Sequence, residues 1–155
     1  MKDAANRLAR GVDIAARSLG GAGVAVLSGL IAWVVFSRYA LGTTPRWSEE
    51  LPRLILVWVT WLGVASAFIR GSHFEAGILP LILRDGPARR AAGWLARIAT
   101  FCFLVVLVVT GWKITLFTWS HAMTALTLPK GLFYLALPVG AGASLIGMIA
   151  ARLAR

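Results

Sequence analysis

Long uninterrupted apolar stretches dominate the hydrophobic pattern of this chain. Each stretch holds about 19 to 23 residues, and an α-helix needs about 20 to cross the ~30 Å hydrocarbon core of a bilayer. The stretches cover residues 19–41, 51–69, 91–112 and 131–151. This pattern predicts an all-α integral membrane protein with four transmembrane helices in a single membrane domain, residues 1–155. Arg97 interrupts the third stretch, so three spans plus a re-entrant piece is the main alternative.

The connections between these stretches differ in character. Residues 42–48 are few and include Pro45, which predicts that the first two helices are antiparallel neighbours. Residues 74–90 contain an apolar run, but it is too short and too interrupted to span a bilayer. They fit an interfacial segment in the inner loop, with its arginines at the lipid headgroups. Residues 4–18 could form a second, weaker surface helix.

The composition agrees with a lipid environment. The chain is 59% hydrophobic and 14% charged, with a mean hydropathy of +0.78, whereas soluble domains are about half apolar and a quarter charged. A net charge of +10 could suggest nucleic acid, but the basic residues lie between apolar runs, as charges excluded from hydrocarbon do. The lipid bilayer is therefore an expected partner, and nucleic acid is not.

The distribution of basic residues predicts the orientation. If the N-terminus is inside, the inner segments carry eleven lysines and arginines and the outer segments carry five. The inner set is Lys2, Arg7, Arg10, Arg17, Arg70, Arg84, Arg89, Arg90, Arg97, Arg152 and Arg155. The outer set is Arg38, Arg46, Arg53, Lys113 and Lys130. The positive-inside rule then favours both termini in the cytoplasm.

Small residues recur at helical spacing in three of the predicted spans. Such residues let helix backbones approach closely in lipid, although glycine and alanine are also common in membrane spans for no specific reason. The candidate helix-packing residues are Gly21, Ala25, Gly29, Gly63, Ala67, Gly140, Ser144 and Gly147.

Ionisable groups are missing from the centres of the predicted spans, where a transporter that works alone would handle ions. His73 and His121 flank the third span on opposite sides of the membrane, so they cannot hold one haem between them. Cys102 is the only cysteine and can form no intramolecular disulfide. We therefore expect no catalytic, cofactor-binding or metal-binding residues in this chain.

The outer start of the second span gathers most of the remaining polar character. Ser48 could cap the helix, Glu49 and Glu50 fall in its first turn, and Arg53 follows at pairing distance. One interpretation is a capped, self-neutralised helix start at the interface. The other is that these charges meet a partner protein, because two adjacent acids exceed what one cap requires.

The inner end of the same span reads Arg70, Gly71, Ser72 and His73. A positive-inside flank followed by a glycine stop explains it, and an interaction surface is the alternative. The candidate subunit-interface residues at the two ends are Trp47, Glu49, Glu50, Arg53, Arg70 and His73.

In their order and spacing, these residues resemble the DctQ-like small membrane subunit of tripartite ATP-independent periplasmic (TRAP) transporters. The resemblance covers roughly residues 38–150. It runs from the acidic motif at 47–53 through Gly63 and residues 70–73 to the stretch 134–140. Residues 74–77 depart from the family's usual hydrophobic-and-aspartate pattern.

The resemblance implies a non-catalytic subunit of the bacterial inner membrane. Such a subunit scaffolds a large membrane subunit, in which sodium and substrate are expected to bind, and a periplasmic solute-binding protein delivers an organic anion, usually a carboxylate. The alternatives are a membrane anchor or assembly subunit of a redox complex, and the four-span small subunit of tripartite tricarboxylate carriers, which the Trp-Ser-Glu-Glu motif speaks against.

Overall fold

The computed structural model describes residues 2–70 and 87–153, which form four long helices and one short 3-10 turn. Helix α1 covers Lys2–Ala40, η1 covers Arg46–Ser48, α2 covers Glu50–Ile69, α4 covers Pro87–Thr118 and α5 covers Gly131–Leu153. Each of the four α-helices is long and apolar enough to cross a membrane. The predicted all-α fold with four spans is confirmed, so three spans plus a re-entrant piece is not needed.

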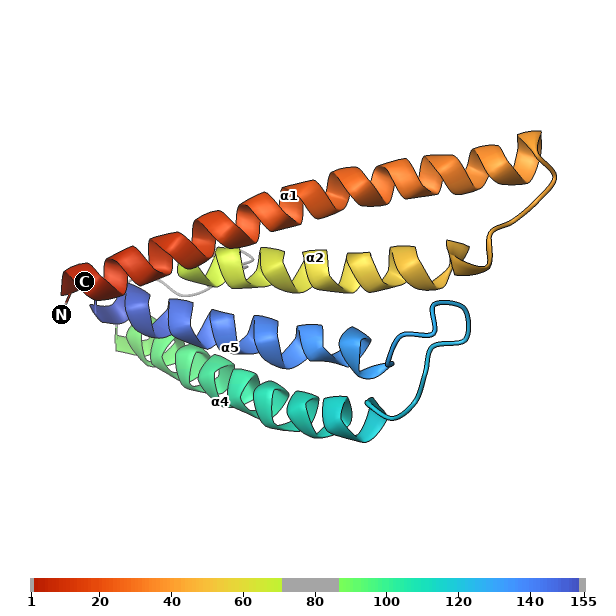
Figure 1. Cartoon of the computed structure of the whole chain (residues 1–155). Helices are drawn as coiled ribbons and strands as arrows, with labels where there is room; N and C mark the ends of the chain where they lie inside the picture. Colours follow the sequence, from red (N-terminus) through yellow and green to blue (C-terminus); the bar gives the residue numbers. More distant parts are fainter. Residues whose placement is uncertain (1, 71–86, 154–155) are drawn as a thin grey trace.

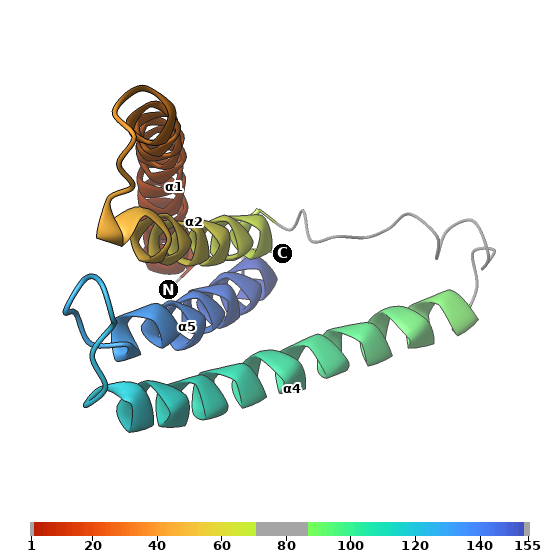
Figure 2. The same ribbon diagram turned by 90° about the vertical axis from the view of Figure 1, so that its right-hand side faces the viewer.

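The helices lie side by side in the order α1, α2, α5, α4 (Figures 1 and 2). Helix α5 is central, with α2 on one side and α4 on the other, and α1 packs mainly on α2. Both termini lie at one end of the row, and the α1–α2 and α4–α5 connections lie at the other (Figure 1). The first two helices are therefore antiparallel neighbours, as the short connection predicts.

Helix α1 is continuous from Lys2, so the separate surface helix predicted over residues 4–18 is wrong. Its inward positions follow a 3-4 alternation, the spacing that keeps one narrow stripe of a helix against a neighbour. The stripe is made of Asp13, Ala16, Gly20, Gly23, Leu27, Leu30, Val34 and Ser37. Because this stripe starts at Asp13, residues 13–18 of the predicted surface helix already belong to the stretch of α1 that packs on α2.

The C-terminal end of α1 is closed by its own loop. Gly42 has a φ of 66°, a left-handed conformation that commonly ends helices and that glycine adopts without strain. The backbone N–H of Thr43 donates to the Ser37 carbonyl at 3.2 Å, and the Ser37 hydroxyl donates to the Thr43 carbonyl at 2.9 Å. This closure turns the chain directly into η1 and α2.

Helix α4 is longer than the predicted third span at both ends. Its first turn includes residues 87–90 of the predicted interfacial segment, and the location of this turn at the membrane surface stays a prediction. The remainder of the segment, residues 74–86, lies outside the described residues.

The core is small because much of each helix surface faces outward. Ala65, Ala136 and Ala141 are fully buried, as are Ser144 and Thr115. The two hydroxyls donate at 2.8 Å to carbonyls of their own helices, Ser144 to Gly140 and Thr115 to Gly111. They therefore cost little to bury. Small side chains at the α5 interfaces allow the close helix approach that association in lipid requires.

Candidate functional site

Polar side-chain contacts between distant parts of the chain gather at the two ends of α2. At the end away from the termini, the Glu50 side chain reaches the α4–α5 loop. One carboxylate oxygen accepts the backbone N–H of Thr124 at 3.0 Å, and the other accepts those of Ala125 at 2.8 Å and Leu126 at 3.0 Å. Hydrogen bonds to an ionised acceptor are stronger than neutral ones. Glu50 therefore holds the tip of this loop against the start of α2.

The loop itself is a short turn between two paired backbone segments. The N–H of Met123 donates to the Leu128 carbonyl and that of Lys130 to the His121 carbonyl, both at 2.7 Å. Thr127 adopts a φ of 52°, which the turn requires. The three N–H groups that Glu50 accepts lie within this turn, so the carboxylate supplies acceptors for donors that the turn leaves unpaired.

A second contact secures the same end of the row. The indole N–H of Trp58 donates to the Leu132 carbonyl at 3.2 Å, in the first turn of α5, where Gly131 approaches α4 closely. A Cβ at Gly131 would stand 2.5 Å from a ring carbon of Trp119 and 3.0 Å from the Thr115 carbonyl oxygen. Helices α2, α5 and α4 are therefore fixed to one another at this end.

The predicted capping arrangement at the start of α2 is wrong. Ser48 ends η1, and the N-cap position is Glu49, which makes no side-chain cap hydrogen bond. In the described part of the chain neither acid pairs with Arg53, because Glu50 turns toward the loop. Glu49 and Arg53 are exposed and Trp47 is half-buried. The exposed charges of this motif are thus Glu49 and Arg53, while Glu50 binds the α4–α5 loop.

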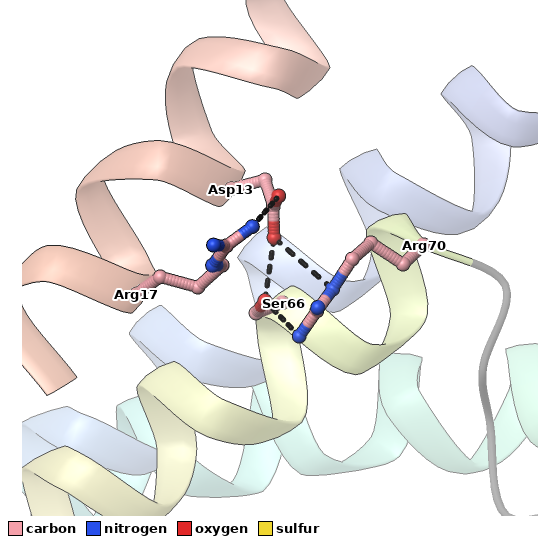
Figure 3. Close-up of polar contacts among 4 residues, drawn as sticks. All are labelled: Asp13, Arg17, Ser66 and Arg70. Carbon is pink, nitrogen blue, oxygen red and sulfur yellow. Dashed lines mark hydrogen bonds and ion pairs between the residues drawn. The ribbon is translucent and has the colours of Figure 1, made fainter. Parts of the chain in front are cut away.

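At the opposite end of α2, four polar side chains meet at the contact between α1 and α2 (Figure 3). The Ser66 hydroxyl donates to an Asp13 carboxylate oxygen at 2.5 Å, and the Arg70 Nε lies 3.6 Å from the same oxygen. Arg17, one turn beyond Asp13, lies 3.7 Å from the other carboxylate oxygen. We call these four residues the Asp13 cluster; it joins the beginning of α1 to the end of α2.

The Asp13 cluster is half-shielded from its surroundings. Asp13 and Ser66 are buried, whereas the Arg70 and Arg17 side chains are 52% and 60% exposed. A buried carboxylate needs compensating donors, and here a hydroxyl and a guanidinium provide them. Arg70 also donates to the Ser66 hydroxyl at 3.1 Å, so the arginine predicted for a subunit interface is engaged within this chain.

Asp13 is not among the candidate site residues that the sequence predicts. The available signal was the 3-4 spacing that places Asp13 on the same stripe as Ala16 and Gly23. His73, the other predicted residue at this end, lies outside the described residues.

The predicted packing residues of α5 lie in close helix contacts. A Cβ at Gly140 would stand 2.6 Å from the Trp61 Cβ, and one at Gly147 would stand 2.5 Å from the Ile69 side chain. Ser144, between them, is fully buried. This face of α5 therefore meets α2 with almost no space to spare.

The predicted packing residues of α1 and α2 lie elsewhere. Gly21, Gly29 and Gly63 have no atom within 4 Å of a Cβ built on them, Ala25 is exposed and Ala67 is half-buried. The close approach of α1 to α2 occurs instead at Gly23, where an added Cβ would collide with Val59. Gly21, Ala25 and Gly29 repeat every four residues on the face turned away from α2.

These features define a helical membrane protein whose polar groups mostly secure its own helices. In the described residues, no group of histidine, cysteine, aspartate or glutamate side chains could hold a metal ion. A model of the family described as tripartite ATP-independent periplasmic transporters, DctQ component, matches residues 27–155. Since the match covers most of the chain, the protein belongs to this family. A search among curated proteins finds no match.

Family membership settles the class of function. The chain is a small permease subunit of a TRAP transporter, located in the inner membrane, and it is not an enzyme. In TRAP systems such a subunit works with a large membrane subunit and a periplasmic binding protein. The family assignment replaces the alternative of a redox-complex anchor.

Proposed function

We propose that this chain is the scaffold of a sodium-coupled TRAP transporter and takes no direct part in moving substrate. It steadies the large membrane subunit, which binds sodium and substrate. A periplasmic binding protein delivers the substrate, an organic anion of the carboxylate class. Both termini of the small subunit lie in the cytoplasm.

The observation that carries this proposal is the open arrangement of the helices. A four-helix row has two edges, and here α4 makes its main contacts with α5 alone. Large apolar side chains are exposed along its length, including Leu95, Phe103 and Phe117 at 61–76%. A row with such an edge offers a long apolar surface to a neighbouring membrane protein, as well as to lipid.

The described core supports a static role. The buried positions where α2, α5 and α4 meet are small or apolar, and their hydroxyls bond to their own helices. The buried ionisable residue, Asp13, lies at one end and not in the middle of the row. Substrate and sodium handling is therefore assigned to the large subunit.

Exposed charges at the loop end offer an electrostatic docking point. Glu49, at the N-cap of α2, stands four residues before Arg53, and neither makes an ion pair with any described residue. Charges that pair with opposite charges on a partner protein fix the position of that partner more than they add to its affinity. We assign Glu49, Arg53 and the neighbouring Trp47 to the contact with the large subunit.

Co-expression of this chain with the large membrane subunit of its transporter, only one of the two tagged, tests the proposal. The expected result is stable co-purification in mild detergent and a clear loss of recovery with the double change Glu49→Gln, Arg53→Ala. Arg38→Gln, another exposed arginine at the same end, serves as the control and should leave recovery unchanged. Failure of the unmodified chain to co-purify would contradict the assigned role.

A further inference from the structure

Near the end that carries the termini, a groove of about 260 Å³ opens between α4 and α5. Its lining is overwhelmingly apolar, with one charged residue. The lining residues are Trp94, Arg97, Ile98, Phe101, Met148 and Ile149.

The charge in this groove lies toward the end of the membrane span. The Arg97 guanidinium stands over the Trp94 ring, 5.9 Å from its centroid, and Trp94 is one turn closer to the start of α4. Long helical side chains lean toward the N-terminus of their helix, and arginine in lipid extends its charge toward the interface. Phe101 lies one turn in the other direction, so the groove has a cationic, aromatic mouth and an apolar depth.

The charge of Arg97 is energetically unfavourable in a membrane unless an anionic group pairs with it. Arg97 lies on a helix that is long and apolar enough to cross a membrane, within the apolar stretch predicted to span it. An arginine within such a stretch is unfavourable unless its charge is paired or hydrated. The described residues supply no carboxylate to Arg97; its contact there is the Trp94 ring.

We propose that this groove binds one anionic phospholipid of the membrane. The Arg97 guanidinium donates two hydrogen bonds to the phosphate, the geometry that suits a planar fork of N–H groups. Trp94 lies beside the headgroup at the depth typical of interfacial aromatics. One acyl chain runs along Ile98 and Phe101 of α4 and against Ile149 of α5.

The groove favours a lipid over a free phosphate ion. Phosphate could use Arg97, but it would leave the apolar lining uncovered. An acyl chain covers that lining, and the headgroup and chain then bind to one continuous surface. A bound lipid would fill the gap between α4 and α5 near the termini and so strengthen the contact of the edge helix with the row.

Native mass spectrometry of the full chain, alone and with its large membrane subunit, tests this proposal. The probes are phosphatidylglycerol and phosphatidylethanolamine of identical acyl chains. We expect one phosphatidylglycerol to be retained preferentially, Arg97→Gln to lower that preference about tenfold, and Ile149→Trp to lower retention of both lipids by filling the groove. Inorganic phosphate at millimolar concentration should not displace the bound lipid.

Two control variants keep the result specific. Arg10→Gln changes another exposed arginine on α1, and Val139→Trp adds bulk to an exposed position of α5 outside the groove; both should bind lipid as the parent chain does. Equal preference in Arg97→Gln and the parent, or equal loss in Arg10→Gln, would overturn the proposal. Preferential binding to the isolated chain that vanishes in the complex would also overturn it, by showing that the partner subunit fills the groove.

Discussion

Glu50 in the first turn of α2 accepts a 2.8 Å hydrogen bond from the backbone N–H of Ala125, 75 positions later in the chain. The same carboxylate accepts two more N–H groups from the flanking residues of that turn. The sequence predicts that Glu50 either belongs to a capped helix start or meets a partner protein. In the structure it binds the backbone of a distant loop in the same chain. Its neighbour Glu49 makes none of these contacts and is exposed.

Replacing Glu50 with glutamine should loosen the α4–α5 loop. A glutamine presents one oxygen and one NH₂ group, so at least one of the three backbone donors faces another donor. We expect faster amide hydrogen exchange at residues 124–126 and a lower melting temperature in detergent. Glu49→Gln is the matched control and should change neither quantity; equal protection of the loop in both variants would show that Glu50 does not hold it.

The contact between α2 and α5 should tolerate almost no added volume at Gly140. An alanine there would place its Cβ 2.6 Å from the Trp61 Cβ, so the helices must separate or the indole must move. Overpacking of this kind typically costs about 1–3 kcal/mol, measurable as the free energy of unfolding in mixed micelles with SDS. Gly142→Ala, where nothing lies within 4 Å, should be neutral or slightly stabilising. Similar effects of the two changes would contradict the close contact.

The Asp13 cluster should contribute measurably to the attachment of α1. In Asp13→Ala the buried Ser66 hydroxyl loses its acceptor and Arg70 loses its counter-charge, which together should cost about 1–3 kcal/mol of unfolding free energy. Asp13→Asn keeps an oxygen for Ser66 and should recover part of this loss. Arg17→Gln removes an exposed pair on one helix and should cost less than about 0.5 kcal/mol of unfolding free energy. A loss as large as that of Asp13→Ala would contradict the view that Ser66 and Arg70 are the more important partners of Asp13.

The number of long apolar helices could be predicted from the sequence because hydrophobic length is a local property of each segment. The second span, predicted over residues 51–69, differs from helix Glu50–Ile69 by one residue. The ends were predicted less well: residues 113–118 and 87–90 extend α4, since polar and basic side chains at an interface permit a helix to continue.

The contacts between helices were harder to predict because they depend on the rotation of each helix. The repeat of Gly21, Ala25 and Gly29 indicated one packing face, but α1 turns Gly23 toward α2. The α2 partners of Asp13, which are Ser66 and Arg70, and the loop partners of Glu50 lie more than fifty residues away in sequence. The spacing of residues along one segment cannot predict such a pairing. The small residues of α5 were easier to predict, because α5 lies at the centre of the row and has a neighbouring helix on each side.

The proposed orientation makes a direct prediction for labelling. With Cys102 replaced by serine, a single cysteine at Lys130 should react in intact cells with a membrane-impermeant maleimide that reaches the periplasm. A cysteine at Arg10 should react only after the membrane is opened, because the basic residues at that end hold it in the cytoplasm. The opposite pattern of labelling would place both termini outside.

The scaffold role is tested most directly by sodium-driven uptake into proteoliposomes. The substrate should be the radiolabelled carboxylate that raises the melting temperature of the transporter's own periplasmic binding protein. Vesicles that contain this chain together with the large membrane subunit, with the loaded binding protein outside, should accumulate the anion under an inward sodium gradient. Vesicles with this chain alone should accumulate none above protein-free vesicles. Uptake by this chain alone would contradict the account, because a scaffold without its large subunit has no means of carrying substrate.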